Sequence, residues 1–252
     1  MYQGRSISVV LPTYNERDSI RACIKGFEAT GVVDEIIVVN NNAAEGTSEQ
    51  VAGTSAIEVM EKRQGYGSAI VRGLRESTGD LVCVCEPDGT FEAKDLFKML
   101  PYSDEVDIVF GTRTVGEFIW EDANMGWFLR LGNWGVAKLM EVLFNTNSLS
   151  DVGCTLRVMN RRAVNELLPM LREMGSCLGA EMMVVSRVIK LRTVQIPVNY
   201  RARVGTSSVT GRRLSAVAVG LRMIWVILSY RVGIARVRAR AVEPATEHQV
   251  SA

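Results

Sequence analysis

The first half of the chain alternates short runs of consecutive apolar residues with longer segments in which apolar positions recur every three or four residues. Short apolar runs are typical of buried strands, and the longer period is typical of amphipathic helices. This alternation predicts an α/β fold of βαβ units, in which helices flank a mostly parallel central sheet. We expect strands at residues 7–11, 35–39, 57–60, 81–85 and 108–110.

A polar or glycine-rich turn follows each of these predicted strands. In chain order the turns read PTYNE, NNNAAEGT, KRQGYGS, EPDGTF and GTRT. The carboxyl ends of parallel strands meet at one edge of a sheet, and ligands of α/β proteins bind in the crevice at that edge. We therefore expect these turns to line one binding site.

The turn after the fourth predicted strand contains the carboxylates Glu86 and Asp88, one residue apart. Mg²⁺ or Mn²⁺ is commonly held by one or two carboxylates together with the phosphates of a substrate. The turn therefore suits a metal ion that carries a nucleotide diphosphate. Acidic residues in a Pro/Gly turn are also typical of a solvated loop, which is the alternative.

The regular alternation ends near residue 113. Residues 117–147 indicate a loop and then a long helix, followed by a helix at 177–190, a strand at 194–200 and a last helix at 214–230. The last helix has Arg222 near its centre and fewer apolar positions than the roughly 20 that span a bilayer. We expect this amphipathic helix either to lie in a membrane interface or to pack on the body of the protein.

The composition is that of an ordinary globular chain of 252 residues, 47% hydrophobic and 23% charged, with a net charge of +1. The charge is unevenly distributed, because residues 201–252 contain nine arginines and only two glutamates. A cationic end favours an anionic partner such as a membrane surface or a phosphate. Nucleic acid is not an expected partner, because interleaved aromatic residues and a recognisable binding module are missing.

Histidine and cysteine usage excludes several kinds of site. The only histidine is His248, which excludes a Ser-His-Asp triad and a histidine-ligated zinc ion. The five cysteines lack the spacing of a disulfide or zinc framework, which predicts reduced thiols. A dinucleotide-binding oxidoreductase is not expected, because the first strand-to-helix turn contains no glycine. The N-terminal apolar run is too short for a signal peptide, which indicates a cytoplasmic protein.

Several motifs, taken in order, resemble those of the family 2 glycosyltransferases of GT-A fold, especially the branch with dolichol-phosphate mannose synthase and the bacterial polyprenyl-phosphate glycosyltransferases. VVLPTYNE resembles the opening strand and turn, KRQGYGSAIVRGL the Lys-x-x-Gly-x-Gly segment, EPDGTF the metal motif and FGTRT the Gly-Ser-Arg turn. SDVGCTLRVMNR and NYRARVGTSS are similar to later acceptor-side and donor-side segments. We accordingly expect a catalytic domain at 1–211, a basic membrane-interface helix at 212–240 and a disordered tail at 241–252.

The resemblance implies a binding site for a nucleotide-diphosphate sugar. It implies that Asp88 and Glu86 hold Mg²⁺ or Mn²⁺, with Glu86 in place of the family's first aspartate. Asn40 and Asn41 stand where the family has paired aspartates, and an amide complements uracil, which favours a UDP-linked over a GDP-linked sugar. The implied donor-binding residues are Pro12, Tyr14, Asn15, Glu16, Asn40, Asn41, Lys62, Gly65, Gly67, Glu86, Pro87 and Asp88.

The KRQGYGS turn is expected to contact the phosphates of this donor. Lys62 can reach a phosphate or the sugar. Gly65 and Gly67 would let the backbone approach closely at the start of a helix, where N–H groups favour anions.

The acceptor is expected to be a phosphate. The second pKa of a phosphate monoester is about 6, so this acceptor needs positive charge rather than a general base. The family pattern implies that Arg113 and Arg130 hold the acceptor phosphate and that Arg203 closes over the diphosphate. The catalytic residues would be Asp88, Arg113, Arg130 and Arg203, and the acceptor-binding residues Arg113, Arg130, Asp151, Arg157, Glu181 and Ser207.

The predicted activity is the inverting transfer of one sugar to a polyprenyl phosphate by an enzyme associated peripherally with the cytoplasmic face of the membrane. Large apolar residues adjoin Arg130 on the predicted helix, namely Trp127, Phe128, Leu131 and Trp134. They favour a lipid acceptor and a membrane partner, and a second copy or a membrane subunit can take part. Two alternatives stay open. One is a soluble saccharide or protein acceptor with Glu181 or Asp151 as the base, and the other is a non-enzymatic nucleotide-binding protein at a membrane.

Overall fold

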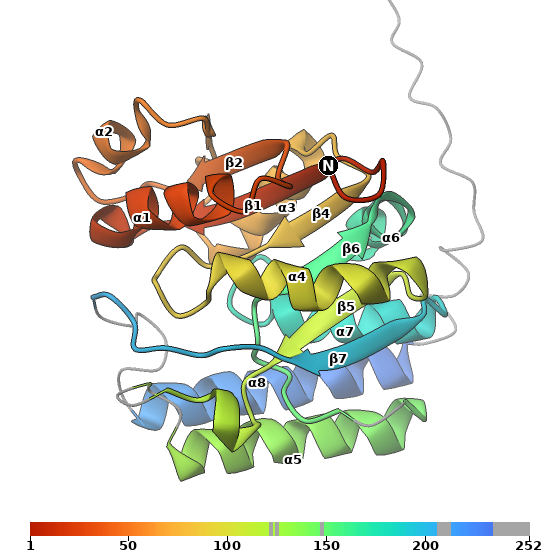
Figure 1. Cartoon of the computed structure of the whole chain (residues 1–252). Helices are drawn as coiled ribbons and strands as arrows, with labels where there is room; N and C mark the ends of the chain where they lie inside the picture. Colours follow the sequence, from red (N-terminus) through yellow and green to blue (C-terminus); the bar gives the residue numbers. More distant parts are fainter. Residues whose placement is uncertain (121–122, 124–125, 147–148, 206–212, 234–252) are drawn as a thin grey trace, which may run out of the picture.

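The computed structural model describes residues 1–120, 123, 126–146, 149–205 and 213–233. Its centre is a seven-stranded sheet in the order β3-β2-β1-β4-β6-β5-β7 (Figure 1). Neighbouring strands are parallel except in the two pairs that involve β6, so the predicted α/β fold is confirmed. The strands are β1 (Ile7–Thr13), β2 (Glu35–Asn40), β3 (Ile57–Met60), β4 (Leu81–Val84), β5 (Ile108–Thr112), β6 (Arg157–Asn160) and β7 (Thr193–Pro197).

The sequence pattern does not predict strand β6. This strand has four residues and begins with an arginine, so it shows neither a long apolar run nor a clear alternation. It runs antiparallel between β4 and β5 and pairs Arg157 with Val84 and Phe110. Because β4 and β5 are both antiparallel to β6, they point the same way, and the turns that follow them reach the same edge of the sheet.

Two hydrophobic clusters cover the two faces of the sheet and form the core. Val9 of β1 belongs to one cluster and Val10 to the other, as expected for a strand buried on both faces. One cluster contains residues of α1 (Arg17–Glu28), α2 (Thr47–Val51) and α4 (Leu96–Met99). The other contains residues of α3 (Tyr66–Glu76), α6 (Arg161–Leu167) and α7 (Leu178–Val188). Short 3-10 helices lie at Ala93–Asp95, Leu100–Asp104, Gly116–Phe118 and Leu168–Met170.

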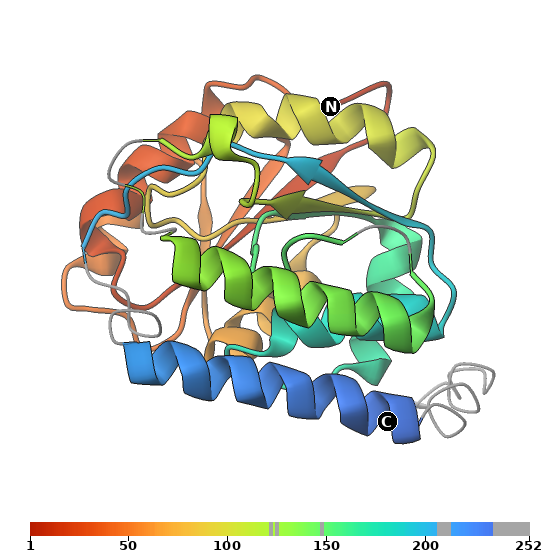
Figure 2. The same cartoon turned by 90° about the horizontal axis from the view of Figure 1, so that it is seen from below.

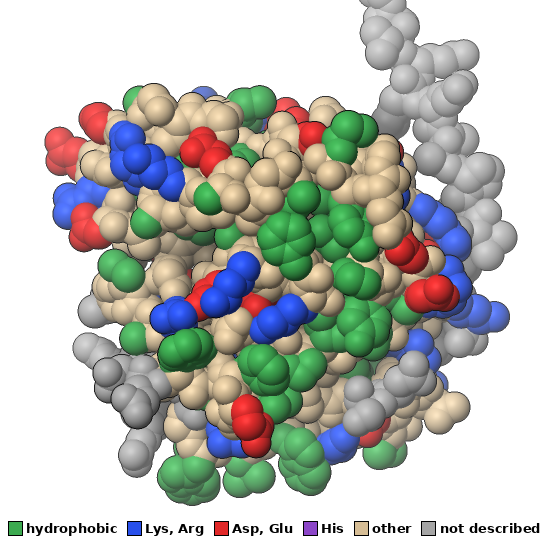
Figure 3. Space-filling view, in the orientation of Figure 1, with side chains coloured by type: hydrophobic (Ala, Val, Ile, Leu, Met, Phe, Trp, Pro, Cys, Tyr) green, Lys and Arg blue, Asp and Glu red, His purple; other side chains and the backbone are tan. Residues whose placement is uncertain are grey.

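Helices α5 (Trp127–Phe144) and α8 (Arg213–Val232) lie side by side on one flank of the molecule (Figure 1, Figure 2). Each helix buries one side, because Met140 of α5 and Ile227 of α8 belong to the same core cluster as α3, α6 and α7. Their other sides expose large hydrophobic residues. Figure 3 shows apolar side chains along the lower edge, where Figure 1 places α5.

Helix α8 has 20 residues and extends beyond the predicted 214–230 at both ends. By length and composition alone, Ser215–Val232 is apolar enough to cross a membrane. Arg222 in the middle of the helix forms an ion pair of 3.1 Å with Glu173, which attaches α8 to the body of the protein. The predicted tail at 241–252 lies outside the described residues.

Candidate active site

The turn after β4 fixes Asp88 in a buried position. Asp88 is 1% exposed, and its Oδ1 accepts hydrogen bonds from the Thr90 N–H at 2.9 Å and the Thr90 hydroxyl at 2.5 Å. Gly89 has a φ of +82°, in the left-handed region that favours glycine. The Pro87 carbonyl accepts a hydrogen bond of 2.6 Å from the Ser19 hydroxyl of α1. These contacts hold the Asp88 carboxylate in one orientation.

A segment that follows β7 covers this turn. We call residues 198–205 the strap. The N–H of Arg201 donates to the Thr90 carbonyl at 2.9 Å, and the N–H of Val204 donates to the Asp88 carbonyl at 2.8 Å. The backbone of the strap is therefore attached to the turn on both sides of residue 203.

The strap places the guanidinium of Arg203 among three carboxylates. Its Nη2 lies 2.5 Å from Asp88 Oδ2 and 3.0 Å from Glu86 Oε2, and its Nη1 lies 3.9 Å from Glu16 Oε1. The structure thus brings four of the predicted site residues together from the β1 turn, the β4 turn and the strap.

Glu86 lies in an environment that disfavours its charge. Burial and the neighbouring Asp88 carboxylate raise the pKa of Glu86 to about 7, against the opposing positive charges of Arg203 and Arg113. The negative charges of Glu86 and Asp88 repel each other unless a cation lies beside them. In this structure the cation is Arg203.

These residues fit a divalent metal ion. Asp88 Oδ2 is buried and accepts no hydrogen bond among the described residues, and it forms an ion pair with Arg203 at 2.5 Å. Its described partner is therefore a cation, and a buried carboxylate oxygen of this kind also suits a metal ion. Among the described residues no cluster of three or more His, Cys, Asp or Glu side chains could hold a metal. An ion held by Asp88 and Glu86 would therefore complete its coordination with phosphate oxygens of a substrate.

The structure corrects the role expected for Asp151. This residue is 0% exposed, and its carboxylate accepts hydrogen bonds from Nε and Nη2 of Arg113 at 2.8 and 3.0 Å. It also accepts the N–H groups of Arg113 and Gly153 at 3.0 and 2.8 Å. Burial alone would raise the pKa of Asp151, but Arg113 and these hydrogen bonds hold it below its usual value. Asp151 is therefore placed as the anchor of Arg113, which disfavours its expected roles as a base or as an acceptor contact.

Arg113 lies between this anchor and the carboxylate site. Its guanidinium is 5.2 Å from the centre of the Tyr200 ring in the strap, and its charge counteracts the rise in the pKa of Glu86. Gly153 leaves room for it, because a Cβ at Gly153 would lie 2.8 Å from Arg113 Nη2. Asp151 binds Nε and Nη2, and the Nη1 donors of Arg113 have no hydrogen bond among the described residues, which makes them available to an anion.

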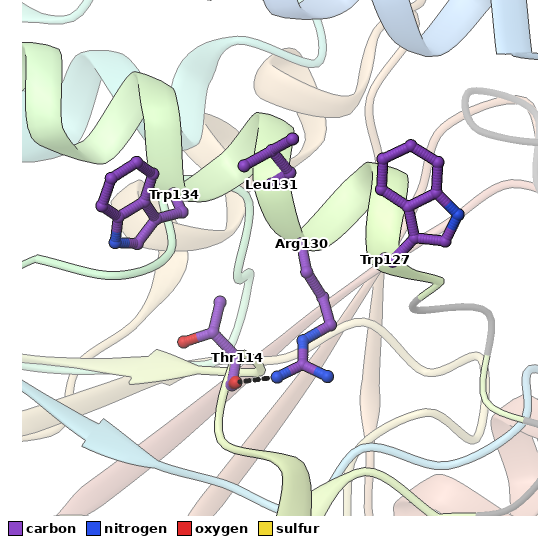
Figure 4. A pocket seen from close by; sticks show the side chains of 5 residues that line it. All are labelled: Thr114, Trp127, Arg130, Leu131 and Trp134. Carbon is purple, nitrogen blue, oxygen red and sulfur yellow. Dashed lines mark hydrogen bonds between the residues drawn. The ribbon is translucent and has the colours of Figure 1, made fainter.

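Arg130 lies in an open cavity of about 460 Å³ lined by Thr114, Trp127, Arg130, Leu131 and Trp134. Figure 4 shows its guanidinium reaching from α5 to Thr114, whose carbonyl accepts a hydrogen bond at 3.1 Å. Trp127 and Trp134 flank it along the helix and are 77% and 50% exposed. Within the described part of the chain, Arg130 has no carboxylate partner. Thr114, which lines this cavity, directly follows Arg113 in the chain.

Two tyrosines that were not among the predicted site residues, Tyr66 and Tyr200, also lie near these charged groups. Tyr200 of the strap is 8% exposed, and burial raises the pKa of its hydroxyl. The charges of Asp88 and Glu86 raise this pKa further, whereas those of Arg113 and Arg203 lower it. Burial and the charge of Glu86 raise the pKa of Tyr66 at the start of α3. Tyr66 lies in the motif KRQGYGS and Tyr200 in the motif NYRARVGTSS. Their positions in these motifs are the sequence signal that could have identified them.

The side-chain amides of the two asparagines after β2 have partners within the protein. Both are buried, and every amide N–H of Asn40 and Asn41 is used inside the protein. Neither side-chain amide has an N–H left to donate to uracil O4, which contradicts the base reading expected of these side chains. The two asparagines therefore give no support to a UDP-linked over a GDP-linked sugar. Their partners are Ser48, Glu58 and Gln64 side chains, Glu61 and Arg63 carbonyls, and Ala43 and Gly65 N–H groups.

The glycines of KRQGYGS approach protein backbone rather than a phosphate. A Cβ on Gly67 would lie 2.6 Å from the carbonyl carbon of Met174, and a Cβ on Gly65 would collide with the same carbonyl group. The N–H of Ser68 donates to the Met174 carbonyl at 3.1 Å. The start of α3 is therefore packed against Met174, where a phosphate contact was expected, which disfavours that contact at these glycines. Lys62 is exposed and remains available to a phosphate.

Arg157 and Glu181 are enclosed in the core, each 1% exposed. The guanidinium of Arg157 donates to the carbonyls of Cys154 and Thr155 at 2.9 and 3.1 Å. Glu181 accepts the Tyr230 hydroxyl at 2.6 Å and two backbone N–H groups, and burial raises its pKa. Arg157 lies against Met182 and the Phe110 ring, and Tyr230 of α8 covers Glu181, which contradicts the expected direct contact of either residue with an acceptor.

The remaining predicted donor residues surround the turn after β1. Pro12 is buried within β1, and Glu16 accepts the N–H groups of Tyr14 and Asn15 at 2.7 and 2.8 Å. Tyr14 and Asn15 are exposed, so their side chains are available to a ligand at this edge. Ser207 lies outside the described residues.

Comparisons with known proteins identify the family of the chain. The family model of glycosyl transferase family 2 matches residues 8–168, which is more than half of the chain. An uncharacterized glycosyltransferase of Mycobacterium tuberculosis is 29% identical over 228 residues, covering 90% of this chain and 99% of the relative. An uncharacterized glycosyltransferase of Mycobacterium bovis matches with the same identity and coverage.

Solved structures share the architecture. Glucosyl-3-phosphoglycerate synthase from Mycobacterium tuberculosis with Mg²⁺ and UDP has a TM-score of 0.69 at 19% identity, covering 91% of this chain and 80% of that chain. The same synthase with Mn²⁺, UDP and glucosyl-3-phosphoglycerate has a TM-score of 0.66 at 18% identity, with coverages of 91% and 81%. These likenesses show the GT-A fold. The chain therefore belongs to glycosyl transferase family 2.

Proposed function

We propose that this glycosyltransferase moves one sugar from a nucleotide-diphosphate sugar to a polyprenyl phosphate at the cytoplasmic face of a membrane. The Arg130 cavity is the observation that carries the proposal. It combines a guanidinium that has no carboxylate partner among the described residues with the exposed side chains of Trp127 and Trp134. A lipid phosphate has the complementary properties, an anionic head and an apolar chain.

The donor half of the proposal rests on Glu86, Asp88 and Arg203. Mg²⁺ or Mn²⁺ bound by the two carboxylates would neutralise the charge that develops on the departing diphosphate. Arg203 reaches the same place and supplies donors for phosphate oxygens. Synthases of this fold were crystallised with UDP and Mg²⁺ or Mn²⁺, which supports a UDP-linked donor.

The acceptor half needs no general base. A phosphate monoester is already anionic near neutral pH, because its second pKa is about 6. One of its oxygens attacks the anomeric carbon, the bond between the sugar and the diphosphate breaks, and the anomeric configuration inverts. Arg130 and the anchored Arg113 hold the attacking phosphate. Asp151 and Glu181 are both enclosed, which weighs against a hydroxyl acceptor that would require a base.

The exposed sides of α5 and α8 support attachment to a membrane. Leu221, Trp225 and Val232 of α8 are 63%, 65% and 89% exposed. The nine arginines among residues 201–252 add positive charge at this end of the chain. A basic residue near an anionic bilayer contributes roughly 1 kcal/mol. We infer that both helices lie in the interface, where a second copy or a membrane subunit can join them.

A soluble phosphorylated acceptor is the second candidate. The synthase of this fold has been crystallised with phosphoglyceric acid and UDP-glucose. The phosphate of such an acceptor would also match Arg113 and Arg130. This candidate leaves the exposed tryptophans of α5 without a role.

The test is a transfer assay on the purified full chain with a panel of UDP- and GDP-sugars. The acceptor is undecaprenyl phosphate in vesicles or 3-phosphoglycerate in solution, and products are identified by mass. We expect a lipid-linked product that requires Mg²⁺ or Mn²⁺. Transfer to phosphoglycerate without any lipid product would replace this proposal with the second candidate.

Arg130→Gln tests the acceptor contact. Loss of a hydrogen bond to a charged group, worth about 1.5–3 kcal/mol, should raise the KM for the lipid phosphate roughly 10- to 150-fold and leave the donor KM unchanged. Arg192→Gln is the matched control, because Arg192 is 68% exposed and precedes β7 at the opposite edge of the sheet. Equal effects of the two variants would contradict the role of Arg130.

Flotation with anionic vesicles tests the membrane contact. Replacing Trp127 and Trp134 by serine should release the protein from the vesicles, whereas Phe97→Ser on α4, 47% exposed, should not. Wild-type protein that fails to float would contradict attachment.

A further inference from the structure

Arg203 and a metal ion compete for the same carboxylate oxygens. Nη2 of Arg203 lies 2.5 Å from Asp88 Oδ2 and 3.0 Å from Glu86 Oε2, the groups that would hold the ion. A Mg²⁺ ion bonded to Asp88 Oδ2 at about 2.1 Å would lie no more than about 4.6 Å from Nη2. The guanidinium would then repel the ion at close range inside a largely buried site.

We propose that Arg203 and the divalent cation are alternative counter-ions of the Glu86–Asp88 pair. Without substrate, Arg203 occupies the pair and keeps the affinity for the metal low. The metal enters together with the diphosphate of the donor, and Arg203 moves from the carboxylates to the phosphates. The inference rests on the donor half of the proposed function and does not depend on the acceptor.

The balance of charge explains why the exchange needs the diphosphate. Arg203 brings one positive charge to three carboxylates, which are Glu16, Glu86 and Asp88. A diphosphate added to this group alone would meet like charges, and a divalent cation added alone would meet the guanidinium. When both enter, the ion joins the carboxylates to the phosphates, and the guanidinium finds new acceptors on the phosphates.

The geometry of the strap permits this exchange. The backbone is attached to the turn through the N–H groups of Arg201 and Val204, so the position of residue 203 is fixed. Val204 also packs on the turn, because a Cβ on Gly89 would lie 3.1 Å from its side chain. The Arg203 side chain is 24% exposed, and the contacts described for its guanidinium are with carboxylates. A long side chain on a fixed backbone can change rotamer without displacing the strap.

Arg201 provides a matched control on the same segment. Its guanidinium forms an ion pair with Glu92 and lies 4.0 Å from the centre of the Trp120 ring, away from the carboxylate pair. Arg201→Gln therefore removes the same charge from the strap and leaves the guanidinium at Asp88 in place.

The experiment measures binding of Mn²⁺ alone, from the free-ion electron paramagnetic resonance signal, with and without UDP. Without UDP, Arg203→Gln should bind Mn²⁺ on the order of tenfold more tightly than wild type, within the usual range of coupling between two sites. The factor by which UDP tightens Mn²⁺ binding should fall in the same variant. Arg203→Lys, which keeps the charge, and Arg201→Gln should both retain the wild-type values.

The competition is overturned if Arg203→Gln binds Mn²⁺ without UDP no more tightly than wild type, or if Arg203→Lys tightens binding as much as Arg203→Gln. Where UDP tightens Mn²⁺ binding to wild type, the same factor in Arg203→Gln also overturns it. If UDP has no effect on wild type but Arg203→Gln still tightens Mn²⁺ binding, the competition stands and the donor assignment fails. Far-ultraviolet circular dichroism of each variant shows that the folded protein is being compared.

Discussion

Asp151→Asn tests whether Asp151 serves as the anchor of Arg113 or as a base. The carboxylate is 0% exposed and accepts four hydrogen bonds, three from Arg113 and one from Gly153. Asparagine keeps the shape but loses the charge and one acceptor oxygen. Its amide N–H₂ group would face donors, and the guanidinium of Arg113, 13% exposed, would lose its counter-ion.

Removing one partner of a buried ion pair costs about 3–5 kcal/mol of stability. In a chain of this size each kcal/mol lowers the Tm by about 2–4 °C, so we expect a decrease of roughly 6–20 °C. The matched control is Asp104→Asn, which breaks an ion pair whose partners, Arg5 and Asp104, are 28% and 37% exposed. An exposed pair of this kind contributes less than about 1 kcal/mol.

Thermal denaturation followed by tryptophan fluorescence measures the Tm of both variants, and the transfer assay is run on the folded fraction. We expect Asp151→Asn to raise the acceptor KM, because Arg113 loses its orientation. A variant as stable as the Asp104→Asn control that still loses its rate at neutral pH would refute the anchor and make Asp151 a base.

Asp88→Asn should lower metal-dependent UDP release at least about 100-fold, because electrostatic stabilisation at the leaving group is lost; near-normal turnover, measured beside Asp104→Asn, would contradict the assignment. The second prediction concerns pH. Burial raises the pKa of Glu181, so the folded protein binds the carboxyl proton of Glu181 more tightly than the unfolded chain does. The stability that this proton contributes is fully present below about pH 4.3, the pKa in the unfolded chain. It is lost as the pH rises through the pKa of the folded protein. Glu181→Gln cannot ionise and should lose less stability than wild type from pH 4 to 7 in urea titrations; parallel curves would contradict this.

Local pattern was sufficient for most of the sheet and for the acidic turn. An apolar run followed by a Pro/Gly turn specifies both a buried strand and where it ends, and Glu86 and Asp88 are adjacent to that end in the chain. Strand β6 could not be found this way, because a four-residue antiparallel strand depends on its partners β4 and β5. The enclosure of Arg157 depends on Gly179 and Met182 of α7, which lie more than 20 residues away in the chain, so it was equally invisible in the sequence.

The motifs marked the right segments but did not distinguish the roles of residues within them. Asn41 and Gly67 lie in the predicted turns, yet one holds neighbouring backbone and the other adjoins Met174. A polar or small residue is equally suited to a ligand and to a protein neighbour. Which of the two it meets depends on segments elsewhere in the chain.

The sequence by itself determined which residues follow each buried strand, because the strand period and turn chemistry are local properties. That was enough to place Asp88 at the carboxyl edge of a parallel sheet. Only the tertiary structure decided how the charges pair. Asp151 lies 38 residues from Arg113, and Glu86 lies 117 residues from Arg203. Such pairs form only when the packed core brings distant segments together and removes water from between them.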